Sequence, residues 1–157
     1  MAHLAGKHLT FRLAAEEYGL AILQVREIIG LMDITMIPRT PHFVRGVINL
    51  RGKVIPVIDL RAKFGMPATE DTAQTCIIVV EVHHGASTLP MGVVVDEVSE
   101  VRDIPGDQID PTPAFGSAVD TGFILGIGKI GAEVIMLLDL DQVLDADELT
   151  LVDKIGR

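Results

Sequence analysis

The 157-residue chain has few aromatic and few basic residues. It contains no Trp, one Tyr and five Phe, which leaves little surface on which bases or sugar rings could stack. Thirteen Lys and Arg against 22 Asp and Glu give a formal charge of −9, and such a chain is repelled by phosphate backbones and anionic lipid heads. We therefore expect no binding to nucleic acid or to a membrane surface.

Cysteine and long apolar runs are also scarce. Cys76 is the single cysteine, so no intrachain disulfide can form and a reducing cytosol is the expected compartment. The longest stretch without a formal charge, residues 82–95, contains two His and a Pro and is too short to span a bilayer. The first residues lack the apolar segment of a secretory signal. These features predict a cytoplasmic protein without membrane insertion.

The apolar content points to a β-protein. Apolar residues make up 48% of the chain, and the 34 Val and Ile come in short bursts bounded by Gly, Pro, Asp and His. Residues 9–13 alternate apolar and polar, as expected of a strand with one solvated face. Because no helices of 10–15 residues alternate with these bursts, a parallel βαβ sheet is not expected.

Helical signals are short. Thr40-Pro41 predicts a helix that ends at Gly46, and Asp59 and Asp139 predict capped turns over 60–64 and 140–144. Residues 147–155 are predicted to form a closing helix.

An internal repeat is the most informative feature. Four blocks recur in the same order, with offsets of 73, 72, 76 and 80: 18–28 with 91–101, 40–43 with 112–115, 46–52 with 122–128, and 54–60 with 134–140. Two copies of a β-unit of about 65–75 residues should pack together as small curled barrels, because units of that size bury little core alone. The repeat predicts one domain over 1–157, with subdomain one at about 14–75 and subdomain two at about 76–144. The N-terminal strand and the C-terminal segment are free to cross between the barrels.

The repeat also separates shared positions from specialised ones. In this alignment Asn49 and Arg51 face Leu125 and Ile127, so the fold does not require polar residues there. Arg51 lies in a Gly-flanked hairpin, where it is either an ordinary solvated charge or a partner contact, a role in which arginine is favoured. Charge is unevenly spread as well: residues 45–63 carry five Lys and Arg against one Asp, whereas 139–153 carry six acidic residues and no basic one.

Signals of catalysis are weak. The glycines of residues 126–131 match G-x-G-x-x-G, but a strand rather than a helix is predicted to follow, so a dinucleotide site is not expected. His83 and His84 are adjacent on a predicted hairpin and would point to opposite faces. No nucleophile or acid–base constellation is present. We expect no catalytic residue, metal or cofactor.

Residues 43–61, which read FVRGVINLRGKVIPVIDLR, and residues 17–28, EYGLAILQVREI, resemble the bacterial chemotaxis coupling family, CheW. Residues 92–98 and 121–126 also fit, so the similarity extends from about Leu9 to about Asp153. The resemblance implies an all-β fold of two intertwined five-stranded SH3-like barrels, with short helical turns and a C-terminal helix.

The resemblance further implies a non-enzymatic adaptor. Its partners would be the cytoplasmic tips of methyl-accepting chemoreceptors and the regulatory domain of the histidine kinase CheA, in arrays at the membrane. The partner-binding positions of the family fall on Val25, Glu27, Arg51, Val54 and Leu151, and Asn49 joins them from the repeat. Glu27 and Val25 recur as Glu100 and Val98, and Val54 as Val134, so the fold alone could also explain them. The isolated protein is expected to be a monomer, and a coupling role in a non-flagellar pathway remains open.

Overall fold

The computed structural model describes residues 2–112 and 122–156, most of which form strands. The strands are β1 (Gly6–Leu13), β2 (Glu16–Ala21), β3 (Val25–Gly30), β4 (Val44–Leu50), β5 (Lys53–Asp59), β6 (Cys76–His84), β7 (Ser87–Val95), β8 (Glu97–Ile104), β9 (Ile109–Asp110), β10 (Ile124–Ile130) and β11 (Glu133–Leu138). The helices are α1 (Leu60–Lys63), α2 (Leu140–Val143) and α3 (Ala146–Ile155), with 3₁₀ turns η1 (Ala2–Leu4), η2 (Ile22–Gln24) and η3 (Gly106–Gln108).

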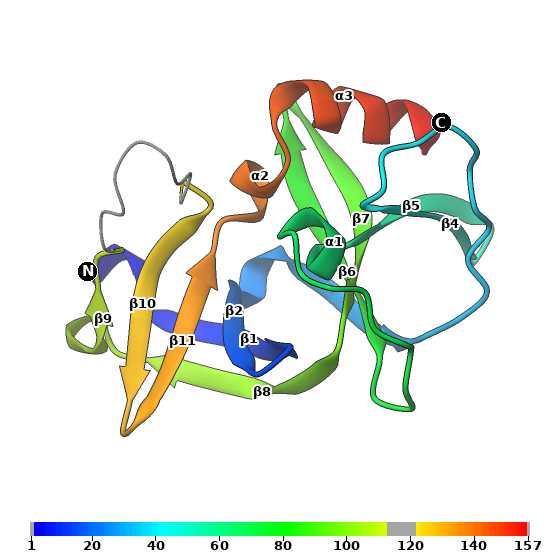
Figure 1. Ribbon diagram of the computed structural model, residues 1–157. Helices are drawn as coiled ribbons and strands as arrows, with labels where there is room; N and C mark the ends of the chain where they lie inside the picture. The colour runs from blue at the N-terminus through cyan, green and yellow to red at the C-terminus, as the bar shows by residue number, and fades with distance from the viewer. Residues whose placement is uncertain (1, 113–121, 157) are drawn as a thin grey trace.

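The strands form two sheets that exchange hairpins. The five-stranded sheet has the order β3-β6-β7-β5-β4, and the six-stranded sheet has the order β8-β1-β2-β11-β10-β9, in which β9 has two residues. The β1–β2 hairpin therefore belongs to the sheet of the second half, and the β6–β7 hairpin to the sheet of the first half (Figure 1). The predicted all-β, intertwined class is confirmed. The ranges 14–75 and 76–144 each contribute strands to both sheets.

The duplication is visible in the strand pairing. Val44 pairs with Ile58 and Ile124 pairs with Leu138, in each case 80 residues later in the second copy, and both pairings contain a register shift before the glycine at 46 or 126. Val57 lies beside Gly92 and Leu137 beside Gly19 in the two parallel pairings. A Cβ at Gly19 would lie 3.0 Å from Leu137 Cδ2, and one at Gly92 would lie 3.1 Å from Val57 Cγ2. Close approach of the parallel strand thus explains why both copies have glycine there.

The core has three parts. The largest cluster lies between the sheets, where residues of β1 such as Phe11 pack with residues of β7 such as Met91 and with Leu60 and Leu140 of the short helices. Smaller clusters lie within each sheet: Ile48, Ile55, Val57, Ile77, Val79 and Val94 in the five-stranded sheet, and Ile104, Ile109, Ile135 and Leu137 in the other. Apolar burial between the sheets makes the two halves one folding unit.

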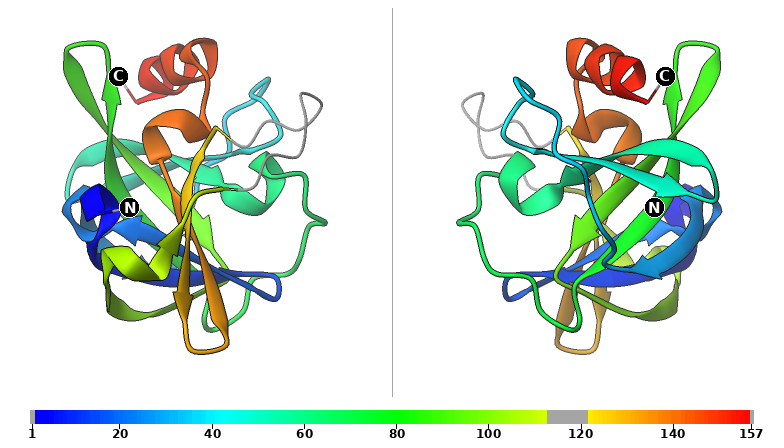
Figure 2. Two further views of the ribbon diagram at one scale, coloured as in Figure 1. Left: turned by 90° about the vertical axis from the view of Figure 1, so that its left-hand side faces the viewer. Right: turned by 90° about the vertical axis from the view of Figure 1, so that its right-hand side faces the viewer.

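The predicted aspartate caps are confirmed. Asp59 accepts hydrogen bonds from the backbone N–H groups of Arg61 and Ala62, and Asp139 accepts one from Asp141. The closing helix, α3, begins one residue before the predicted start, because Asp145 and Glu148 form a capping box. Figure 2 shows α3 beside the tip of the β6–β7 hairpin, at the opposite end of the molecule from the tip of β10–β11. Within the described ranges no helix has the length and apolar character to cross a bilayer.

Two local predictions are wrong. Residues 41–46 form no helix: the Thr40 hydroxyl donates to Ile37 O instead of capping, and β4 begins at Val44. The strand predicted at residues 9–13 is confirmed within β1, but the solvated face expected of it is wrong at Thr10, which is buried and whose hydroxyl donates to Glu100 O at 2.9 Å. In both cases sheet pairing overrides the local pattern.

Candidate functional site

The β4–β5 hairpin turns on Arg51 and Gly52, both with left-handed backbone (φ 52° and 86°). Two such residues between paired strands are typical of a type I′ turn, in which Asn or Gly is preferred. Asn49 supports the turn, because its Oδ1 accepts a hydrogen bond from Gly52 N at 2.8 Å. Asn49 therefore has a structural task, and Arg51 occupies a conformation that is uncommon for an arginine.

The strand registers correct the alignment of this hairpin with its copy. With the structural offset of 80, Asn49 corresponds to Lys129 and Arg51 to Gly131, instead of Leu125 and Ile127. Gly131 has φ 60°, which glycine adopts without steric strain. The first copy thus carries an arginine where the second has the residue that the turn favours, which supports a functional role for Arg51.

Glu27 holds the arginine from the other edge of the sheet. The Arg51 guanidinium is ion-paired with the Glu27 carboxylate, with Nη1 donating to Oε2 at 3.3 Å and Nη2 to Oε1. This hydrogen bond from Arg51 lowers the pKa of the Glu27 carboxyl below its ordinary value. Because the Arg51 side chain remains 70% exposed, its charge is oriented but still accessible to a partner.

A hollow of about 250 Å³ opens beside this ion pair. Its apolar floor comes from Leu50, Ile55 and Val79, and charged side chains surround it: Arg26, Glu27, Arg51 and Lys53. Arg26 is ion-paired with Glu81, which lies on the neighbouring strand, β6. No sequence motif marks Arg26, and Lys53 stands out in the sequence only as one of the five basic residues of 45–63. The alternation along β5 predicts its place beside the hollow, because Lys53 lies on the same face as Ile55.

The other expected site residues lie at varying distances from this hairpin. Val54 pairs with Asn49 and is 46% exposed. Val25 begins β3, two residues before Glu27, and is partly buried against the core between the sheets. Leu151 lies on a separate element, α3, and is partly exposed. The structure thus brings Glu27 against Arg51 and places Asn49 and Val54 in the same hairpin as Arg51, whereas Val25 lies on β3 and Leu151 on α3.

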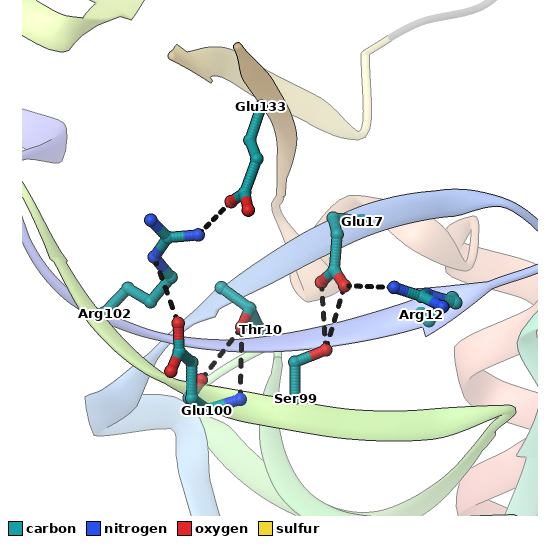
Figure 3. A network of polar contacts seen from close by, with 7 residues as sticks. All are labelled: Thr10, Arg12, Glu17, Ser99, Glu100, Arg102 and Glu133. Carbon is teal, nitrogen blue, oxygen red and sulfur yellow. Dashed lines mark hydrogen bonds and ion pairs between the residues drawn. The ribbon is translucent and has the colours of Figure 1, made fainter. Parts of the chain in front are cut away.

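The second sheet carries a related but inverted contact. Arg102 on β8 is ion-paired with Glu133 at the start of β11, and its Nε lies 3.4 Å from Glu100 Oε1 (Figure 3). Arg102 corresponds to Ile29 through the offset of 73, and Glu133 to Lys53 through the offset of 80. An edge strand and a hairpin meet through an Arg–Glu pair in both sheets, but in the second sheet the arginine is on the strand and the glutamate on the hairpin.

Two other sequence motifs, the glycine string from Gly126 and the histidines at 83 and 84, lie on strands and turns. The glycines at 126 and 128 lie in β10, and β11 follows, so the predicted strand after the G-x-G-x-x-G string is confirmed. His83 contacts Asp141, with Nδ1 and Oδ2 at 2.9 Å, and His84 Nε2 lies 3.9 Å from Asp153. Among the residues that the structure describes, no group of three or more His, Cys, Asp or Glu could hold a metal ion.

Comparisons with known proteins show which family and which solved structure the chain resembles. A family model described as the CheW-like domain matches residues 7–148. Chemotaxis protein CheW of Klebsiella aerogenes is 38% identical over 95% of this chain and 87% of its own length. CheW of Rhizobium meliloti is also 38% identical, over 92% and 96%. The crystal structure of the scaffolding protein TtCheW from Thermoanaerobacter tengcongensis superposes with a TM-score of 0.80, at 38% identity over 92% of this chain and 96% of that one.

Proposed function

The chain belongs to the CheW family, and we propose that it is a non-enzymatic adaptor that links the cytoplasmic tips of chemoreceptors to the regulatory domain of the histidine kinase CheA. The observation that carries the proposal is the Glu27–Arg51 pair on a strained turn. The resemblance assigns both residues to receptor coupling, and the geometry supports this by presenting the guanidinium to solvent.

A chemoreceptor tip is a helical hairpin, so recognition would use apolar anchors and a few orienting charges. The apolar floor of the hollow and the charges around it offer both, and Val54 adds an exposed apolar side chain on the opposite face of β5. An adaptor of this kind controls a kinase without chemistry of its own, because it needs only different affinities for the signalling states of the receptor. The proposal places the protein in the cytoplasm, recruited to receptor arrays.

Binding of the purified protein to a CheA regulatory domain and to a soluble chemoreceptor signalling fragment tests this function. Arg51→Ala should weaken receptor binding, whereas Arg12→Ala removes an arginine whose ion pair with Glu17 lies on the other sheet and should not. Failure of the unchanged protein to bind either partner at high micromolar concentrations would overturn the proposal.

A further inference from the structure

One of the cations that line the hollow beside Arg51, the ammonium group of Lys53, has no ion-pair partner among the described residues. Arg26 is paired with Glu81 and Arg51 with Glu27, but no hydrogen bond or ion pair joins the side chain of Lys53, whose backbone pairs with Leu50, to another residue in ranges 2–112 and 122–156. With Glu81 included, these side chains amount to three cations and two carboxylates, so one positive charge remains at Lys53.

Strand alternation directs Lys53 toward the hollow. Lys53, Ile55 and Val57 are alternate residues of β5, and Ile55 and Val57 are buried in the core of this sheet. The aliphatic stem of Lys53 thus continues this apolar row while its ammonium group stays in solvent. Such a position suits an incoming side chain that has both an apolar stem and a charge.

In the second sheet, the residue at the position equivalent to Lys53 forms an ion pair within the protein. Glu133 takes the place of Lys53, and its carboxylate receives the guanidinium of Arg102 from the edge strand. In the first sheet the edge-strand position is Ile29, which packs on the core and offers no charge. The second sheet therefore completes its charge pair internally, and the first leaves the equivalent position open.

We propose that Lys53 receives an acidic side chain, Glu or Asp, of the receptor, with the methylene groups of that side chain against Leu50 and Ile55. This inference rests on the proposed function and adds the chemistry of the partner at the same site. Lys53 and Arg51 then have different tasks, since Arg51 is already paired and Lys53 supplies the unpaired charge.

Binding of a soluble chemoreceptor signalling fragment to charge variants tests the inference. Removing the charge with Lys53→Met should weaken binding about five- to tenfold, and reversing it with Lys53→Glu should weaken it more than tenfold, because a like charge then faces the receptor carboxylate. The salt dependence of binding should fall in both variants. Lys129→Glu makes the same change in net charge on the other sheet and should alter affinity less than about twofold.

A compensating change identifies the receptor residue. Reversing the matching receptor carboxylate to Lys should restore binding to Lys53→Glu. Unchanged affinity of Lys53→Glu, or an equal loss in Lys129→Glu, would overturn the inference while leaving the proposed function in place. If the unchanged protein binds neither receptor fragment nor kinase domain, both are overturned.

Discussion

Arg51 and Glu27 join the two ends of the five-stranded sheet. Glu27 lies on the edge strand β3, and Arg51 lies in the turn that connects β5 to the opposite edge strand, β4. A curled sheet of this order brings its first and last strands near each other, and a side-chain ion pair spans them. The pair therefore both fixes the hairpin against the edge strand and presents a charge.

Arg51→Gly should separate binding from stability. Glycine relieves the left-handed backbone at this position, which offsets the loss of the exposed ion pair with Glu27, so the melting temperature should change little while receptor binding weakens. Thermal unfolding followed by circular dichroism, together with a binding assay, measures the two effects. A clear fall in melting temperature would show that Arg51 is needed mainly for the fold.

The ionisation of Glu27 should depend on Arg51. Because the folded pKa of Glu27 is lowered, the stability from the pair is present at neutral pH and is lost as pH falls through that lowered pKa, below the ordinary value of 4.5. In Arg51→Ala the pKa should move back up, as followed by carboxyl-carbon NMR titration. Lys129→Ala, a remote loss of charge, should leave it in place.

Arg61→Ala should destabilise the fold, unlike Arg51→Ala. Arg61 Nη1 donates to Asp96 Oδ2 at 2.6 Å, and its Nε and Nη2 donate to Pro67 O, with only 15% of the side chain exposed. Loss of these contacts should lower the free energy of unfolding by about 1–3 kcal/mol, measured by urea denaturation. Equal effects of the two substitutions would contradict the distinction between a structural and a functional arginine.

Gly46→Ala should be among the most damaging single changes in the repeat motif. A Cβ at this position would lie 2.0 Å from Thr35 O, and the backbone has φ 141°. The free energy of unfolding should fall by more than about 2 kcal/mol. Gly85→Ala is the control: φ is also positive there, but no atom lies within 4 Å of the new Cβ, so a loss near 1 kcal/mol or less, of about the size of backbone strain alone, is expected.

The sequence predicts which strands and helical turns the fold contains, but not how the strands are arranged in the sheets. Val and Ile bursts, the repeat and the Asp59 and Asp139 caps predicted strands and helical turns that the structure contains. The family resemblance implies intertwined barrels, but the repeat alone does not show which hairpins are exchanged, because it is the same whichever copy a hairpin joins. The block at Gly46 was aligned four residues away from its structural partner, Gly126, because glycines and aliphatic residues recur at even spacing along a strand and allow several registers.

The candidate site could likewise be predicted only in part from the sequence. Arg51 stands out in the sequence because it has no polar counterpart in the second copy, and its structural counterpart, Gly131, is not polar either. Its contact with Glu27 depends on how the sheet curls, and the role of Asn49 in the turn depends on the backbone of Gly52. The proposed role of Lys53 depends on the hollow beside it and on the inverted pair Arg102–Glu133, both of which need the structure.

The exchanged hairpins also constrain the order of events during synthesis. β2 pairs with β11 in the finished protein, at Tyr18 and Met136. The β1–β2 hairpin is synthesised first, but it cannot form this pairing until nearly the whole chain has been made. The five-stranded sheet can be completed once Val95 has emerged, whereas the other sheet needs Leu138. Contacts between residues so far apart in sequence form slowly. Neither half should therefore fold when expressed alone, and the proposed coupling surface on the first sheet would be in place before the second sheet is closed.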